Sequence, residues 1–405
     1  MAEKKQKKWI HFRHRVITEV ARYILGPYCC LKYGYKVERF RGQGNRPWLI
    51  LLNHQTPFDQ FFAGLCFRGP VYYMATEDIF SKGWISEVIR WLIAPIPIRK
   101  QTTDINAVMS CIRVAREGGS ICIAPEGNRT YSGRTEYMNP AIVGLAKKLH
   151  LPIALYRIEG GYGAEPRWSD CVRRGPMRGY VSQVIQPEEY DAMTNQALQA
   201  RIEEGLFVNE AVEDFHYHSN KRAEYLERAI YVCPFCGLAE FESHGNTAKC
   251  LRCGREVEYG TDKKLTGIGC DFPFTFMAQW YDYQKDFINT LDVTRHTAQP
   301  LYRDRAELRE VIVYRRKELL HKNASVALYG DRVVIEEGTE HQLVLPFAEI
   351  TAAAVLGKNK LNLYHNKKVY QFKGSKRFNA LKYVHICFRC KNIARGEENS
   401  TFLGL

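Results

Sequence analysis

Between about residue 47 and residue 190, short apolar runs alternate with stretches of helical periodicity. Four apolar runs predict buried strands, at residues 48–52, 71–75, 120–124 and 153–158. Helices are predicted over 104–117, from Pro57, from Pro140 and through the polar sequence at about 195–228. Strands and helices that alternate in this way indicate an α/β sheet with helices packed against it.

From about residue 317 the hydrophobic pattern changes to a period of two. Two hairpins and a final helix are predicted: strands 326–328 with 333–335, strands 361–363 with 369–372, and a helix over 376–392. Short strands closed by one helix suggest a small β-barrel or sandwich. The segment 357–378 holds seven Lys/Arg and no acid, which is typical of a solvated basic face. A patch for lipid head groups is the alternative.

The N-terminal region is basic and amphipathic. Residues 8–25 can be wound as a helix with an apolar side that includes Val16, Val20 and Ile24. Residues 1–46 hold twelve Lys/Arg against three Asp/Glu, which predicts an anchor lying on an anionic membrane surface. A helix that simply docks on its own core is the alternative.

Membrane-spanning and exported proteins are not expected from this sequence. No window has the roughly 18 consecutive apolar residues that span a bilayer. The apolar run at 23–25 is followed at once by Gly26 and Pro27, and this makes a poor signal peptide. The protein is therefore expected in the cytoplasm, peripheral on the inner face of the cell membrane.

Composition and charge further limit the classes of protein and partner that are expected. The chain has 405 residues, of which 45% are hydrophobic and 25% charged, and this excludes a disordered, collagen-like or multi-spanning membrane protein. The net charge of 58 − 44 = +14 favours acidic partners such as nucleic acid, anionic lipid or a phosphorylated substrate. Thirteen cysteines in a cytoplasmic chain indicate thiols and metal rather than disulfides.

Residues 53–59 read Asn-His-Gln-Thr-Pro-Phe-Asp, where a predicted strand meets a predicted helix. Helix capping explains Thr56, Pro57 and Asp59 without any function. It does not explain His54, which stands at a strand end where the active sites of open α/β sheets collect. Asp59, five residues later, could orient the imidazole and stabilise its protonated form, so that His54 acts as a general base.

Residues 123–130 read Ile-Ala-Pro-Glu-Gly-Asn-Arg-Thr and follow another apolar strand. Arg129 could offer its guanidinium fork to a phosphate, and Gly127 would let the backbone approach it closely. An ordinary Pro-Glu-Gly turn is the alternative.

Taken together, the two segments resemble the glycerolipid acyltransferases, the 1-acyl-glycerol-3-phosphate acyltransferase family. The Asn-His-four residues-Asp motif of this family is matched by Asn53, His54 and Asp59. Its Phe-Pro-Glu-Gly-Thr-Arg-Ser motif is matched by Pro125, Glu126, Gly127 and Arg129, with Ala124, Asn128 and Thr130 departing from it. Two further motifs resemble residues 96–99, which end in Arg99, and residues 151–153. The resemblance covers about residues 35–190.

The resemblance implies direct transfer of a fatty acyl group from acyl-CoA or acyl carrier protein to a lysophospholipid hydroxyl. The first acceptor expected is 1-acyl-sn-glycerol-3-phosphate, which would give phosphatidic acid. His54 would take the proton with Asp59 orienting it, Arg129 and Arg99 would hold the phosphate, and Glu126 would contact substrate or brace its loop. The alternatives are a lipid- or nucleic-acid-binding protein without catalysis, and an O-acyltransferase with a non-glycerolipid acceptor.

Two cysteine pairs form a zinc signature. Cys233 and Cys236 are separated by thirteen residues from Cys250 and Cys253, and four thiolates give a closed tetrahedral site of structural type. Ribbons of this kind often bind nucleic acid, but few base-stacking aromatics accompany this one. Nucleic acid is therefore not expected as a partner.

The fold class expected is an α/β acyltransferase-like domain, followed by a small zinc ribbon and a small β-barrel-like domain with a C-terminal helix. The segments expected are a basic amphipathic helix at 1–34, an acyltransferase domain at 35–228, a zinc ribbon at 229–262, a connecting segment at 263–316 and a β domain at 317–395. The pattern of the last segment resembles a pleckstrin-homology or GRAM domain.

Overall fold

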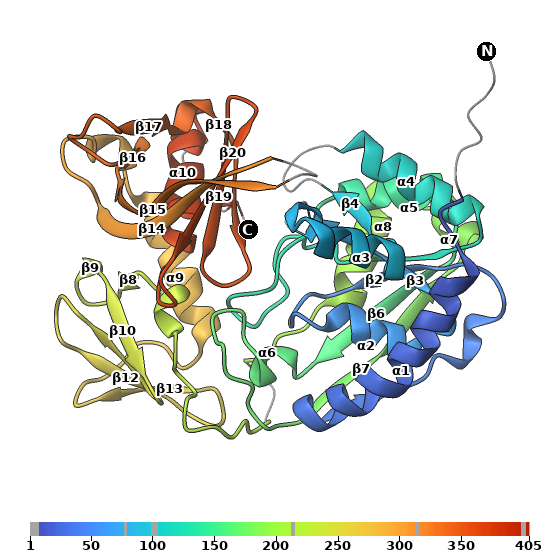
Figure 1. Ribbon diagram of the computed structural model, residues 1–405. Coiled ribbons are helices and arrows are strands. Elements are labelled where there is room, and N and C mark those ends of the chain that lie inside the picture. Colours follow the sequence, from blue (N-terminus) through green and yellow to red (C-terminus); the bar gives the residue numbers. More distant parts are fainter. Residues whose placement is uncertain are drawn as a thin grey trace, which may run out of the picture. The chain divides into compact units, whose positions relative to one another are not determined.

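The computed structural model describes residues 8–76, 79–98, 104–211, 215–312, 316–397 and 402–404 (Figure 1). The chain forms two compact units. The first comprises Met1–Thr130, Arg134–Ala164 and Arg174–Glu210, and the second comprises Tyr131–Gly133, Glu165–Arg173 and Ala211–Leu405. Among the described residues, no helix is both long enough and apolar enough to cross a bilayer.

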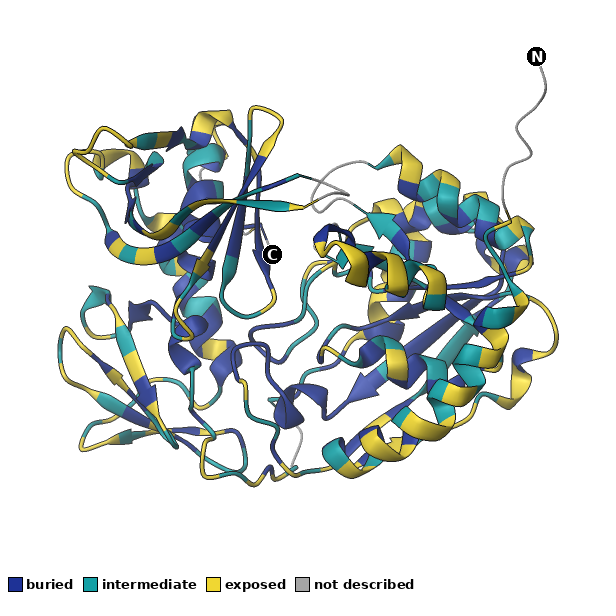
Figure 2. Ribbon diagram, in the orientation of Figure 1, coloured by how far each residue is buried: buried dark blue, intermediate teal, exposed yellow. Residues whose placement is uncertain are grey.

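A seven-stranded sheet forms the centre of the first unit, in the order β1-β7-β6-β2-β5-β3-β4. Its strands are β1 Tyr35–Val37, β2 Leu49–Leu52, β3 Val71–Thr76, β4 Ile96–Ile98, β5 Ser120–Ile123, β6 Ile153–Glu159 and β7 Met177–Ile185. β7 runs antiparallel to β6 and parallel to β1, and the other pairings are parallel. β2 and β5 are buried along their whole length, as expected of parallel strands covered on both faces (Figure 2).

The helices of this unit are α1 Phe12–Tyr33, α2 Asp59–Cys66, α3 Trp84–Ile93, α4 Ile105–Arg116, α5 Ala141–Leu149, α6 Gly161–Ala164, α7 Pro187–Asp191 and α8 Asn195–Leu206. The chain steps along the sheet from β2 through β3 to β4, and then back through β5 to β6. Because such crossovers are right-handed, α2 and α3 cover one face of the sheet, and α4 and α5 cover the other. α1 lies on the same face as α2 and α3 (Figure 1).

α1 differs from the helix predicted over residues 8–25. It begins at Phe12 and continues through Gly26 and Pro27 to Tyr33. The proline is tolerated because Cys29 and Tyr33, in the turns that follow it, are fully buried. Tertiary packing therefore overrides the local signal for a helix end.

Two more helix boundaries differ from the predictions. α2 begins at Asp59, with Phe58 at its cap position, rather than at Pro57 with Thr56 as its cap. The predicted helix over 195–228 ends at Leu206, because the chain then pairs with residues 134–135 of its own unit. In α2, Thr56 still accepts the backbone N–H of Phe58 at 3.1 Å, as a cap residue does, but the regular helix begins only at Asp59.

The second unit contains two antiparallel sheets and the hairpin of β8 with β9. The sheet orders are β10-β11-β12-β13 and β17-β16-β15-β14-β20-β19-β18. The elements are β8 Val232–Cys233, β9 Gly237–Leu238, β10 Phe241–His244, β11 Thr247–Cys250, β12 Glu256–Tyr259, β13 Leu265–Ile268, α9 Met277–Thr290, β14 Tyr302–Val311, β15 Lys317–Leu328, β16 Arg332–Ile335, β17 Leu343–Pro346, β18 Ile350–Leu356, β19 Lys360–His365, β20 Lys368–Gly374 and α10 Leu381–Ala394.

The larger sheet is built from two meanders, β14–β17 and β18–β20, joined where β14 pairs with β20. A register shift between Ala306 and Leu308 marks a bulge in β14, and bulges of this kind curl a sheet. α10 contributes buried side chains, among them Leu381 and Val384, to the apolar core of this unit. The predicted α/β domain, cysteine-bearing ribbon and curled β domain with a C-terminal helix are therefore confirmed.

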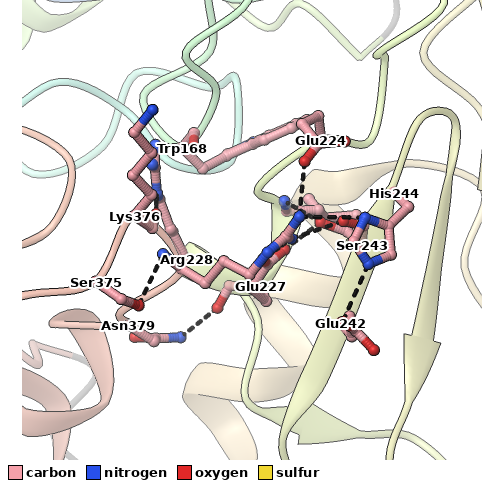
Figure 3. Close-up of polar contacts among 12 residues, drawn as sticks. Trp168, Glu224, Glu227, Arg228, Glu242, Ser243, His244, Ser375, Lys376 and Asn379 are labelled. Atoms are coloured by element: carbon pink, nitrogen blue, oxygen red, sulfur yellow. Dashed lines mark hydrogen bonds and ion pairs between the residues drawn. The ribbon is translucent and has the colours of Figure 1, made fainter. Parts of the chain in front are cut away.

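Polar contacts connect the ribbon sheet to the curled sheet (Figure 3). Ser243 of β10 donates to Glu227, and the guanidinium of Arg377, beyond β20, pairs with Glu227 and with Glu224 at 2.8 Å. Arg228, which is almost fully buried, forms two bonds of 2.9 and 3.0 Å with the carboxylate of Asp170. The ribbon and the curled sheet thus share a network of charged groups.

This network changes the interpretation of the basic segment 357–378. Lys358 pairs with Glu165 at 3.0 Å, Lys368 pairs with Glu310 at 3.0 Å, and Arg377 lies in the network described above. Three of the seven cations are therefore partly neutralised by acids elsewhere in the chain, which argues against a dedicated patch for lipid head groups.

Candidate functional site

The two segments singled out in the sequence meet at one edge of the sheet. β2 and β5 are parallel neighbours, with Leu49 opposite Ile121 and Leu51 opposite Ile123. Residues 53–59 follow β2 directly, and residues 124–130 follow β5. Both loops therefore leave the carboxyl ends of adjacent parallel strands, where ligands bind in open α/β sheets.

His54 and Asp59 form a hydrogen-bonded pair. Nδ1 of His54 lies 2.8 Å from Oδ2 of Asp59. The Asp59 side chain is fully buried, whereas the His54 side chain keeps 17% of its surface exposed. The carboxylate also accepts backbone N–H groups of Gln55 at 2.6 Å and Thr56 at 2.9 Å, and the Thr56 hydroxyl donates to it at 2.6 Å. Asp59 is thus fixed by the loop that carries His54.

The loop after β5 is bonded to the loop after β2 at three points. The backbone N–H of His54 donates to Oε1 of Glu126 at 2.8 Å, and the N–H of Thr130 donates to the carbonyl of His54 at 3.1 Å. Nε of Arg129 donates to the carbonyl of Gln55 at 2.8 Å. These bonds place Arg129 beside the His54–Asp59 loop and hold both ends of the His54 backbone.

A family model described as Acyltransferase matches residues 35–156, a range that contains both loops. Residues 35–156 form an acyltransferase domain. The family resemblance that the sequence predicts is thereby confirmed. The solved structure of the 1-acyl-sn-glycerophosphate (LPA) acyltransferase PlsC from Thermotoga maritima is similar with 20% sequence identity and a TM-score of 0.40, over 48% of this chain and 78% of that chain. No curated protein matches the sequence.

The structure describes two of the three remaining predicted site residues of the acyltransferase domain. Gly127 has a φ of +66°, in the left-handed region that favours glycine, so a side chain there would strain the loop. Glu126 contacts the backbone of His54, which favours the bracing alternative. Arg99 lies outside the described residues, directly after β4.

Asn53 and Thr56, close to His54 in the chain, have positioning roles that the sequence does not predict. The amide of Asn53 bonds to both backbone groups of Ile158 at 2.8 and 2.7 Å, which ties the end of β2 to β6. The Thr56 hydroxyl holds Asp59 and accepts the N–H of Phe58 at 3.1 Å. The spacing of Thr56 and Asp59 is also the spacing that helix capping requires, so the sequence alone does not indicate that Thr56 positions Asp59.

Glu126 predicts a pH dependence of stability. Removal of its carboxyl group from water raises its pKa to about 8 in the folded chain, well above its usual range. The folded state therefore binds more protons than the unfolded state between about pH 4.5 and 8, and stability falls as the pH rises through this window. In denaturant titrations from pH 5 to pH 8, we expect the free energy of unfolding of wild type to fall relative to that of Glu126→Gln. A difference that stays constant would contradict this.

The four predicted cysteine ligands converge in the second unit. The sulfur atoms of Cys233, Cys236, Cys250 and Cys253 all lie within 4.8 Å of one another. The Sγ distances are 3.7 Å for Cys233 with Cys253 and for Cys236 with Cys250. Tetrahedral zinc with bonds of about 2.3 Å requires sulfur atoms about 3.8 Å apart. The cluster can therefore hold one metal ion, and its dimensions fit zinc.

Proposed function

We propose that this chain is an O-acyltransferase that moves a fatty acyl group from an acyl thioester to the hydroxyl of a lysophospholipid. The observation that carries the proposal is the His54–Asp59 pair at the strand edge of a domain of the acyltransferase family. The acceptor proposed is 1-acyl-sn-glycerol-3-phosphate, with acyl-CoA or acyl carrier protein as the donor. The enzyme would act on the cytoplasmic face of a membrane.

The proposed reaction is a single displacement. His54, with Nδ1 bonded to Asp59, would accept the acceptor's hydroxyl proton at Nε2 while the oxygen attacks the thioester carbonyl. The C–S bond then breaks, and the leaving thiolate takes the proton back from the imidazolium. Asp59 would stabilise that imidazolium without becoming protonated. No covalent enzyme intermediate is needed, so no cysteine acts as a nucleophile.

The cations of the site would bind the acceptor's phosphate. Arg129 is anchored through Nε at the Gln55 carbonyl, and its terminal nitrogens would contact phosphate oxygens. Arg99 would be a second phosphate ligand. Glu126 would fix the position of His54 rather than contact substrate. A binding protein without catalysis is the weaker hypothesis, because it gives no reason for a partly exposed His54 to be bonded to the buried Asp59.

The test is a product assay. Purified protein is given lysophosphatidic acid, lysophosphatidylcholine or monoacylglycerol with acyl-CoA or acyl carrier protein donors, and the products are identified by mass spectrometry. We expect phosphatidic acid to form fastest. Faster acylation of an acceptor without a terminal phosphate would refute the role given to Arg129, and no acylation of any acceptor would refute the proposed activity.

A further inference from the structure

α1 carries two apolar faces, and the domain covers one of them. Cys29 and Tyr33 are buried against the rest of the unit. The other face is exposed, with Phe12 at 78%, Tyr23 at 80% and Leu31 at 87% of their surface accessible. Its exposed apolar side chains, at helical spacing, are Phe12, Val16, Val20, Tyr23, Ile24, Tyr28 and Leu31. α1 thus docks on its own core, as the second sequence-based alternative states, and it also presents an exposed apolar stripe.

α3 presents a second exposed apolar face. Trp84 is 75% exposed and Trp91 is 57% exposed, and Ile85 and Val88 lie between them, each 42% exposed. Large aromatic side chains are seldom left in water on this scale unless the surface binds something.

The beginning of α1 lies against the end of α3. Nε of Arg13 on α1 donates to the backbone carbonyl of Trp91 on α3 at 3.0 Å, and its guanidinium lies 5.4 Å from the Trp91 ring. Nε1 of Trp9 donates to the carbonyl of Ala94, just beyond α3, at 3.0 Å. Both helices cover the same face of the sheet, and both show long exposed stretches (Figure 2).

We propose that the exposed faces of α1 and α3 form one surface that docks the acyltransferase domain on an anionic lipid bilayer. Tryptophan is enriched where protein meets the lipid head groups, because its ring is apolar and its N–H is polar. Charge supports the same occupant. Arg22 of α1 pairs with Glu19 at 2.5 Å, and Arg90 of α3 pairs with Glu87 at 2.9 Å. The other cations are Arg13, Arg15 and Lys32 on α1 and the exposed Lys82, which precedes α3. Cations around an apolar face complement the negative surface of a membrane.

This inference rests on the proposed function in one respect, which is that the acceptor's acyl chain lies in the bilayer. Docking is measured independently of it. Full-length protein is mixed with phosphatidylcholine vesicles, with or without phosphatidylglycerol, and sedimented with no acyl donor or lysolipid present. Wild type is expected to bind the anionic vesicles more tightly, and salt should release it in part, because screening weakens the cationic contribution and spares the apolar one.

Point variants identify the surface. Trp84→Ser combined with Trp91→Ser should lower the vesicle partition coefficient by about tenfold for each tryptophan. Tyr23→Ser with Leu31→Ser tests the α1 stripe in the same way. The matched control is Ile105→Ser with Met109→Ser on α4, whose side chains are 71% and 56% exposed on the opposite face of the sheet. The control should bind vesicles as wild type does.

All these side chains are exposed, so thermal unfolding of the variants should stay close to that of wild type. Unchanged partitioning of the tryptophan variant would overturn the proposal. A wild-type dimer in lipid-free solution that becomes a monomer in the tryptophan variant would also overturn it, because a second copy of the chain would then be the occupant. Loss of acylation on every acceptor, with vesicle binding intact, would count against the proposed function and leave the docking surface standing.

Discussion

Turnover is expected to fall by about 10²–10⁴-fold when His54 is replaced by alanine, the loss typical of a missing general base. The scaffold of the site should survive this change. The backbone N–H of His54 donates to Glu126, and its carbonyl accepts the N–H of Thr130. Alanine keeps both backbone groups. The measurement is the release of free thiol from the acyl donor at saturating acceptor, with thermal unfolding of the variant as a check of its fold. A folded His54→Ala protein with near-normal turnover would refute the mechanism.

Thr56 offers a graded control for the same mechanism. Its hydroxyl donates to Asp59 at 2.6 Å, so Thr56→Val should loosen the carboxylate that orients His54. Hydrogen bonds to charged groups contribute roughly 1.5–3 kcal/mol, so we expect a loss of about tenfold or more in turnover with little change in KM. Thr56→Ser keeps the hydroxyl and should recover most of the activity. Equal turnover in the valine and serine variants would show that Thr56 does not position Asp59.

The His54–Asp59 pair could be predicted because its determinants are local. Five residues separate its members, and a strand end followed by a helix start brings them together. The contact of Glu126 with His54 could not be predicted in the same way, because it joins residues 72 positions apart and depends on β5 pairing with β2. A pattern of apolar runs indicates that strands exist, but it does not give their order in the sheet.

The same limit explains the two interpretations that the structure changed. Lys358 pairs with Glu165, which is 193 positions away, and Arg377 pairs with Glu227, 150 positions away. A run of cations is basic in sequence even where distant acids neutralise part of its charge. In α1, a proline that favours a helix end is outweighed by the burial of Tyr33 beyond it. In each case the local sequence indicates the chemistry of the segment, and contacts with distant residues decide its structure.

Replacing Cys236 with serine is expected to abolish stable metal binding by the ribbon. Elemental analysis of wild type should give about one zinc per chain, as a four-cysteine site predicts, and the variant should contain almost none. Cys270→Ser is the matched control, because Cys270 is also half-buried in the second unit but lies outside the cluster. The control should keep its zinc. A metal-free wild type that is fully folded would refute the assignment.

Loss of the metal should open the ribbon locally. Around the four sulfur atoms, the buried apolar cluster contains Cys233, Ala239 and Cys250, too few side chains to hold the loops without a metal. The sheet β10–β13 has other support, since Val257 and Tyr259 belong to the large core shared with the curled sheet and Ser243 bonds to Glu227. In hydrogen exchange of Cys236→Ser, protection should therefore fall at residues 232–239 and 250–254 and persist over 302–394. Uniform loss of protection across the whole unit would show that the metal supports the curled sheet as well, and unchanged protection would show that the cysteines pack without it.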